Sequence, residues 1–212
     1  MTRWPLLVLA VIIASLPFFL GLRVSSIAVD APAPVTHRAP TIAAREASLA
    51  FPISRASARI TKKPFGLLVS PKHSPVTPER FSGYHTGVDF ETFPEEQKTD
   101  VAITAVCDGT VLLKRFSQGY GGVVVQACTV NGKAVTVIYG HLALSSIPAK
   151  IGTHLSVGQR IGQLGRGYST ETDGERKHLH FGVHQGSSIN LRGYVGSTAA
   201  LKAWLDPVAL FL

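Results

Sequence analysis

The chain has 212 residues, of which 45% are hydrophobic, and it carries a formal net charge of +8. This length can bury a sufficient core for one domain with appended segments, so several stabilising disulfides are not needed, and only two cysteines are present. The positive charge does not indicate nucleic-acid binding, because few aromatic residues are interleaved with the basic ones and no nucleic-acid-binding motif is present.

Residues 1–28 are typical of a segment that directs export. Met1-Thr2-Arg3 supplies a basic start, and an uncharged apolar run follows from Trp4 to Leu22. The small-x-small spacing of Ser26-Ile27-Ala28 favours a signal peptide that is cleaved after Ala28. The apolar run also approaches the roughly 20 residues that span a bilayer, so an uncleaved membrane anchor is the alternative. Both interpretations predict an extracytoplasmic protein, which is secreted, periplasmic or anchored.

Two segments of different composition precede the predicted domain at 81–212. Residues 29–58 are rich in Ala, Pro, Ser and Thr and predict a flexible linker. Residues 59–80 are basic and interrupted by prolines, and we expect them to lie extended on the domain. Residues 1–80 carry ten Lys/Arg and three Asp/Glu, against eleven and ten in the remainder. Such a basic arm can contact an anionic membrane or anionic cell-wall polymers; alternatively, it only solvates a linker and orients an anchor.

The rest of the chain predicts a domain made mostly of β-strands. Val123–Val130 is rich in β-branched residues, and Asn131-Gly132 separates it from Lys133–Tyr139, which is a strong signal for a two-residue hairpin. Shorter strand-like segments are predicted at 101–105, 109–113, 151–164 and 178–184. Near the C-terminus, Ser197–Leu205 predicts a short helix that ends at Asp206-Pro207.

Cys107 and Cys128 are the two cysteines. A turn around Gln118–Gly121 would join their strands and put the two side chains roughly opposite each other. Outside the cytoplasm such a pair can oxidise, and the disulfide would contribute on the order of 3 kcal/mol through chain entropy. We expect a disulfide, with two buried thiols as the alternative.

Histidines and one aspartate form three short patterns that suit a metal ion. His178 and His180 are two residues apart in an apolar run, so on a strand both imidazoles face the same side. His85 and Asp89 are four residues apart, which keeps both on one face of an extended segment. His141 follows a strand-like run. Imidazoles with a carboxylate are typical of catalytic zinc, where three protein ligands leave a fourth position to water.

These patterns resemble the lysostaphin-type (LytM-type) zinc metallopeptidases, which cut peptide bonds in bacterial peptidoglycan. The family pattern is His-x-x-x-Asp, then a lone histidine after a strand, then His-x-His. All three occur here in that order, between about Phe81 and the C-terminus. The resemblance implies antiparallel sheets of the LytM/lysostaphin catalytic-domain type (a duplicated hybrid motif), with the site in a groove on a sheet. It also implies one Zn²⁺ ion and a peptidoglycan peptide as the substrate.

By this resemblance the zinc ligands are His85, Asp89 and His180, and the catalytic residues are His141 and His178, which flank a metal-activated water. One histidine would take up a proton and one would supply a proton to the leaving amine, and either can fill either role. Two alternatives remain open. One is a catalytically silent protein of this fold that binds the cell wall or activates another hydrolase, and the other is a zinc endopeptidase of extracellular proteins.

Other residues near the motifs are secondary candidates. Tyr84 and Tyr139 adjoin motif histidines and could donate a hydrogen bond to an oxyanion, or could only pack. Arg166, Arg176 and Lys177 flank the site in sequence and could contact substrate carboxylates.

The loop Gly165–Lys177 departs from the compact turn of the family, because it is longer and charged. We expect it to border the cleft and to affect substrate preference. Four histidines outside the motifs are expected at the surface or in loops, and the last of them could also line the rim: His37, His73, His154 and His184.

Overall fold

The structure is a computed structural model that describes residues 49–211. The expected signal peptide or anchor at 1–28 and most of the expected linker lie outside these residues. Within residues 49–211, no helix has the length and apolar character needed to cross a membrane.

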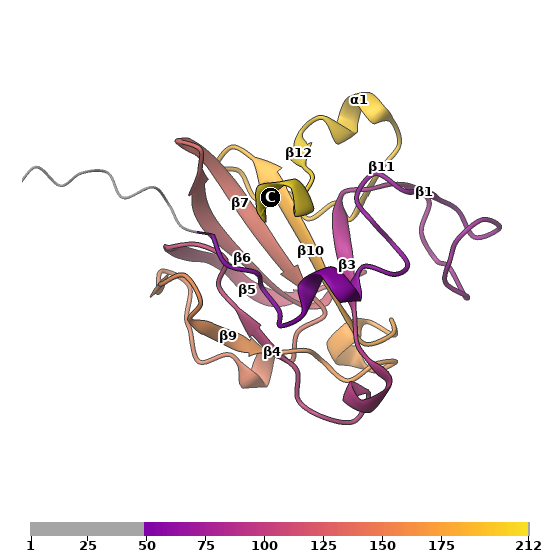
Figure 1. Cartoon of the computed structure of the whole chain (residues 1–212), viewed down its shortest axis with the longest axis horizontal. Coiled ribbons are helices and arrows are strands. Elements are labelled where there is room, and N and C mark those ends of the chain that lie inside the picture. Colours follow the sequence, from indigo (N-terminus) through magenta and orange to yellow (C-terminus); the bar gives the residue numbers. More distant parts are fainter. Residues whose placement is uncertain (1–48, 212) are drawn as a thin grey trace, which may run out of the picture. The chain divides into compact units, whose positions relative to one another are not determined.

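Antiparallel strands dominate the described residues, as the sequence predicts (Figure 1). The strands are β1 (Leu68–Val69), β2 (Gly83–His85), β3 (Gly87–Glu91), β4 (Ala102–Thr104), β5 (Gly109–Ser117), β6 (Gly121–Val130), β7 (Lys133–Gly140), β8 (His154–Leu155), β9 (Arg160–Gln163), β10 (His178–Gln185), β11 (Tyr194–Val195) and β12 (Trp204–Leu205). The helices are α1 (Thr198–Leu201) and the 3-10 helices η1 (Ala56–Arg59), η2 (Pro94–Glu96), η3 (Leu144–Ser146), η4 (Thr170–Thr172) and η5 (Val208–Phe211).

The largest sheet has seven strands in the order β12-β10-β7-β6-β5-β8, and β3 also pairs with β10. A three-stranded sheet, β1-β2-β11, and a two-stranded sheet, β4-β9, complete the arrangement. The predicted hairpin is confirmed: β6 and β7 pair up to Val130 and Lys133. Between them, Asn131 and Gly132 have φ values of 49° and 73°, which suits the tight turn that joins twisted strands.

Strand β10 separates the core from the face that carries the motif histidines. One of its edges pairs with β7, and the other pairs with β3 and then β12. Leu179, Phe181 and Val183 belong to the hydrophobic core. Because side chains alternate along a strand, His178 and His180 face the opposite side. Burial of the apolar residues therefore fixes the direction in which the histidines point.

The C-terminal helix is present but shorter than predicted. Ser197 Oγ caps it by accepting a hydrogen bond from Ala200 N at 3.2 Å, and the helix ends at Leu201. Trp204 and Leu205 do not extend the helix, because they pair with β10 as β12. Trp204 is buried there, so the open edge of β10 gains a partner that a longer helix could not supply.

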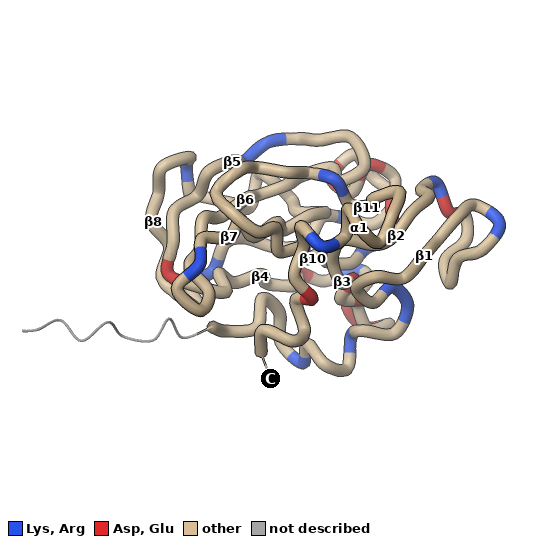
Figure 2. The backbone as a smooth tube through the Cα atoms, turned by 90° about the horizontal axis from the view of Figure 1, so that it is seen from above, with Lys and Arg blue, Asp and Glu red and all other residues tan. Residues whose placement is uncertain are grey.

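The expected linker at 29–58 is wrong for its last ten residues, 49–58. Ile53 and Ala56 lie in the hydrophobic core, and Ala50 N donates to the Val106 carbonyl oxygen at 2.9 Å. These few apolar residues bury against the sheet despite the linker-like composition around them. Further along, the segment that joins β1 to β2 carries both basic and acidic residues (Figure 2).

A disulfide joins Cys107 and Cys128, whose Cα atoms are 6.0 Å apart. The turn at 118–120 connects β5 to β6, as the sequence predicts, so that Cys107, two residues before β5, meets Cys128 on β6. Both cysteines are buried in the hydrophobic core.

Candidate metal centre

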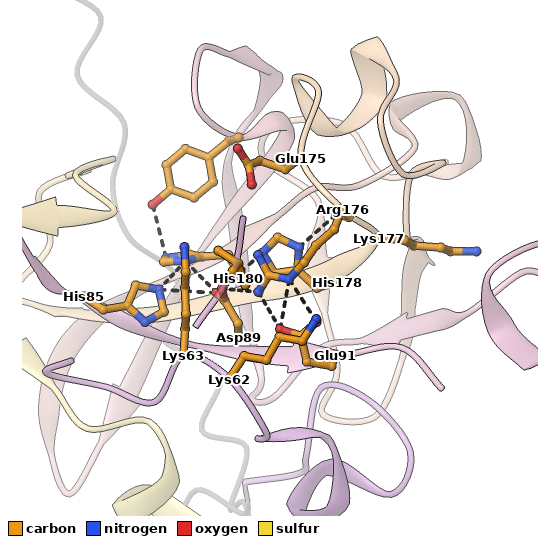
Figure 3. Close-up of polar contacts among 12 residues, drawn as sticks. Lys62, Lys63, His85, Asp89, Glu91, Glu175, Arg176, Lys177, His178 and His180 are labelled. Atoms are coloured by element: carbon orange, nitrogen blue, oxygen red, sulfur yellow. Dashed lines mark hydrogen bonds and ion pairs between the residues drawn. The ribbon is translucent and has the colours of Figure 1, made fainter. Parts of the chain in front are cut away.

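Strands β2, β3 and β10 bring His85, Asp89 and His180 together (Figure 3). Asp89 lies directly opposite His180 in the register of β3 and β10, and His85 ends β2. His85 Nε2 lies 3.0 Å from His180 Nδ1 and 3.3 Å from Asp89 Oδ1. His180 Nδ1 lies 3.3 Å from the same carboxylate oxygen. The three residues that the motifs singled out as ligands therefore converge, and all are buried.

The geometry of this cluster fits a tetrahedral zinc ion. Ligand atoms about 2.0–2.1 Å from zinc lie about 3.3 Å from one another at tetrahedral angles, which is close to the three distances observed. Asp89 Oδ1 is buried and has no hydrogen-bond partner among residues 49–211. A buried carboxylate oxygen is unfavourable unless a cation or a hydrogen bond compensates it. The two nitrogens and one oxygen are also the donor types that zinc binds in catalytic sites.

Groups outside the cluster orient both histidine ligands. His85 Nδ1 lies 3.2 Å from the Pro64 carbonyl oxygen, which can only accept, so this nitrogen carries the proton and Nε2 faces the cluster with its lone pair. His180 Nε2 lies 3.3 Å from the Tyr120 hydroxyl, which leaves Nδ1 for the cluster. Partners of this kind hold metal ligands in a single orientation.

Arg176 holds the carboxylate ligand and also lines the pocket, so its contact with substrate carboxylates stays a prediction. Its Nη2 donates to Asp89 Oδ2 at 2.8 Å, and its Nε donates to Glu91 Oε2 at 2.9 Å. Lys177, in contrast, is buried and does not line the pocket, and its Nζ donates to the backbone carbonyl oxygens of Glu96 and Thr99. Arg166 is exposed and does not line the pocket. The buried carboxylates of Asp89 and Glu91 account for the position of Arg176, because a nearby guanidinium compensates their charge.

His141 and His178 lie beside the cluster, with ring centroids 4.3 Å apart. His178 Nε2 lies 3.3 Å from Asp89 Oδ2, and its Nδ1 lies 2.9 Å from the Arg176 carbonyl oxygen. His141 follows β7, as predicted, and has a φ of 61°, a conformation that is strained for a residue other than glycine. Its Nδ1 is buried and has no hydrogen-bond partner in the described part of the chain.

A pocket of about 240 Å³ is lined by Asp89, His180 and both neighbouring histidines. Aromatic rings form much of the remaining wall. Phe81 stacks on Tyr194 with centroids 5.1 Å apart, and Tyr194 stacks on His85 at 5.2 Å. Glu175, from the charged loop at 165–177, also lines the pocket, so the prediction that this loop borders the cleft is confirmed.

Burial and neighbouring charges set the protonation states in the pocket. Burial, with the nearby His178 and His180, holds the pKa of His141 well below its usual range. Burial also lowers the pKa of His180 to about 4, against the opposing effect of Asp89. Burial alone would raise the pKa of Asp89, but His178 and His85 outweigh it and the pKa lies well below the ordinary value. At neutral pH, His141 and His180 are therefore neutral and Asp89 is ionised.

The two tyrosines singled out from the sequence lie away from the pocket. The Tyr139 hydroxyl donates to Gln126 Oε1 at 2.8 Å and accepts from Val106 N at 3.1 Å, so this residue packs in the core. Tyr84 adjoins His85 on β2 and does not line the pocket. Neighbouring strand residues face opposite sides, which explains the position of Tyr84 beside His85. Tyr139 is two residues before His141, but His141 lies past the end of β7 with a φ of 61°, so strand alternation does not carry over to it.

Among the histidines outside the motifs, His73 and His154 are exposed, as expected, and His37 lies outside the described residues. The expectation that His184 lies at the surface or at the rim of the cleft is wrong, because His184 is buried in β10 and does not line the pocket. Its ring packs edge-on against Trp204 with centroids 4.9 Å apart. The indole of β12 therefore covers the position that we expected at the rim.

The pocket residues that the sequence did not single out include Lys63, Tyr120 and Tyr194. Tyr120 meets His180 across a separation of 60 residues, and Lys63 meets Tyr194 across 131. No local spacing predicts contacts between positions so far apart. The only available signal was the place of Tyr120 in the turn before β6.

The fold is mostly antiparallel β, and its pocket holds a buried cluster of two histidines and one aspartate beside two further histidines. These features define a metallopeptidase-like domain. The chain belongs to peptidase family M23, whose family model matches residues 83–191, about half of the chain. No curated protein matches the sequence.

Several solved structures are similar. LytU is 25% identical, with 70% of this chain and 81% of that chain covered and a TM-score of 0.45. The antimicrobial peptidase lysostaphin from Staphylococcus simulans is 23% identical, with 76% and 52% covered and a TM-score of 0.46. A zinc containing peptidase from Vibrio cholerae is 25% identical, with 65% and 36% covered and a TM-score of 0.41. The match therefore spans about half of lysostaphin and about a third of the Vibrio protein.

Proposed function

We propose that the protein is a zinc-dependent endopeptidase that hydrolyses peptide bonds in bacterial peptidoglycan, in its stem or cross-bridge peptides. The observation that carries this proposal is the unpartnered Asp89 Oδ1, which faces His85 Nε2 and His180 Nδ1 beside a pocket lined by His141 and His178. Membership of a peptidase family supports peptide-bond hydrolysis. The ordered motifs, which resemble those of LytM-type enzymes, support peptidoglycan as the substrate.

His85, Asp89 and His180 would hold one Zn²⁺ ion. When bound, zinc supplies a Lewis acid that polarises a substrate carbonyl and makes water nucleophilic near neutral pH. Asp89 is ionised and His180 is neutral at pH 7, so neither has to lose a proton before the metal binds. Arg176 occupies Asp89 Oδ2 and so leaves Oδ1 for the ion.

His178 and His141 would handle the protons of the reaction. The Arg176 carbonyl oxygen keeps a proton on His178 Nδ1, so Nε2 is the atom that can exchange a proton at the pocket. Burial keeps His141 neutral, and its Nδ1 can accept or donate a hydrogen bond there. A peptide amine is a poor leaving group, so one imidazole has to donate a proton as the C–N bond breaks, while the other accepts the proton of the attacking water.

We also propose that the protein acts outside the cytoplasm, where its substrate lies. The disulfide between Cys107 and Cys128 is typical of oxidising compartments, and the export-like sequence at 1–28 agrees with this. The basic excess of residues 1–80 supports contact with anionic lipid or anionic wall polymers.

The test is digestion of purified peptidoglycan by the zinc-loaded protein, with and without a chelator, followed by mass spectrometry of the released fragments. We expect new peptide termini that disappear with the chelator and return when zinc is added back. A folded, zinc-loaded protein that releases no fragments would contradict the proposal and favour a wall-binding or activating role. Cleavage of a glycine-rich protein but not of peptidoglycan would instead indicate an endopeptidase of extracellular proteins.

A further inference from the structure

A buried ion pair links two residues that precede the region matched by the family model. Lys63 Nζ lies 2.6 Å from Glu79 Oε2, and both side chains are 1% exposed. Glu79 also accepts hydrogen bonds from Ser74 Oγ at 2.7 Å and from Phe81 N at 3.0 Å. Removing two charges from water is unfavourable, and an apolar pair of similar size is often as stable or more stable. Fold stability therefore gives little reason for a lysine at this position.

The backbone around Lys63 contacts two of the three predicted metal ligands. The Lys63 carbonyl oxygen accepts a hydrogen bond from Asp89 N at 2.9 Å. The next carbonyl, that of Pro64, lies 3.2 Å from His85 Nδ1. A little further on, the Leu67 carbonyl oxygen accepts from His85 N at 2.9 Å. A shift of this backbone would consequently displace both ligand residues.

The Lys63 side chain reaches the same histidine by a second route. Lys63 Nζ donates to the Tyr194 hydroxyl at 3.0 Å, and the Tyr194 ring stacks on His85 with an interplanar angle of 28°. Figure 3 shows Lys63 beside His85 and Asp89. The Pro64 carbonyl oxygen thus sets the tautomer of His85, and the Lys63 ammonium group holds the Tyr194 ring that packs on His85.

We propose that Lys63 is a positioning residue of the metal centre, which acts through Tyr194 and through its own backbone to hold His85 and Asp89 in their binding orientation. Glu79 has the supporting role of keeping the ammonium group in place. The proposal rests on the proposed zinc site, and it extends that site to the segment at 60–82, which lies entirely before the family match at 83–191.

The test measures zinc affinity in the full chain, with a competing chromophoric chelator, for the double variant Lys63→Met, Glu79→Gln. We expect at least about tenfold weaker zinc binding, the usual effect of losing an outer partner of a metal ligand. The visible spectrum of the cobalt-substituted protein should shift, because it reports ligand geometry, while the thermal midpoint of the zinc-free protein changes little. Tyr194→Phe should change affinity in the same direction by less, and its effect should not add to that of Lys63→Met.

A matched control uses Arg59, a buried cation that directly precedes this segment. Arg59 pairs with Glu96 at 2.6 Å and contacts no predicted metal ligand. The double variant Arg59→Met, Glu96→Gln removes the same kinds of charge and should leave zinc affinity and the cobalt spectrum unchanged.

The proposal is overturned if the Lys63 and Glu79 variant keeps wild-type zinc affinity and the wild-type cobalt spectrum, or if the Arg59 control loses as much affinity. If the Lys63 variant does not fold, Tyr194→Phe decides, since it removes only a hydroxyl, and unchanged affinity and spectrum would refute the route through Tyr194. A wild-type protein that binds zinc but leaves peptidoglycan intact contradicts the proposed function alone. A wild-type protein that binds no zinc contradicts both.

Discussion

The two faces of the β3–β10 pair have the same backbone but opposite chemistry. One face contributes Phe90, Leu179 and Phe181 to a closed hydrophobic core. The other face presents Asp89 and His180, and leaves a buried carboxylate oxygen without a hydrogen-bond partner among the described residues. The core face supplies the burial that fixes the register, and the polar face uses that register to place its ligands. Changes on the two faces should therefore affect different properties.

The largest effect on the polar face is expected from His180→Ala. Loss of a ligand should weaken zinc binding by more than about 100-fold, beyond the range for outer partners, and should abolish hydrolysis. Zinc content after dialysis measures this directly. His184→Ala is the matched control, because His184 lies on the same strand but packs against Trp204, and this variant should retain zinc. Stoichiometric zinc in the His180 variant would contradict the ligand assignment.

His141→Ala should separate metal binding from turnover on the same face. His141 lies in the pocket without contributing to the ligand trio, so zinc content should stay at one ion per chain. Loss of a proton-transfer group should reduce kcat by about 10²–10⁴-fold. Steady-state kinetics on a peptidoglycan fragment, beside a zinc assay, measure both quantities. An unchanged kcat would remove His141 from the mechanism.

Phe181→Ala tests the core face, one residue away from a predicted ligand. Phe181 is fully buried, and its truncation should reduce the free energy of unfolding by about 3–5 kcal/mol. Chemical denaturation of the zinc-free protein measures this loss. Zinc affinity of the variant under native conditions should stay much closer to wild type than that of the His180 variant. A loss below about 1 kcal/mol would mean that this face does not carry the stability assigned to it.

Removal of the disulfide should give the smallest effect, again confined to stability. The bond joins residues 21 positions apart, for which chain entropy contributes about 3 kcal/mol. The double variant Cys107→Ala, Cys128→Ala should unfold at a lower denaturant concentration than the wild type and should bind zinc with wild-type affinity. Weakened zinc binding at unchanged stability would reverse this expectation.

Much of the fold and of the ligand trio was predictable because both follow from local rules. Alternation along a strand places His178 and His180 together, and Asn131-Gly132 encodes its own turn. The same rules explain the position of His141 after β7.

The surroundings of the site were not predictable, because they depend on contacts between distant segments. The sequence did not indicate that Arg176 compensates the buried carboxylates of β3, or that Lys63 meets Tyr194 across 131 residues. The helix predicted at Ser197–Leu205 is shorter than expected because of another distant contact: Trp204 and Leu205 pair with the edge of β10.

The most direct test of the metal centre is the anomalous scattering of zinc-loaded crystals, recorded on both sides of the zinc absorption edge. We expect one zinc ion per chain, bound by His85 Nε2, His180 Nδ1 and Asp89 Oδ1 at about 2.0–2.2 Å, with His141 and His178 unbound. Zinc held by a different set of residues, or no zinc peak in this pocket, would contradict this expectation.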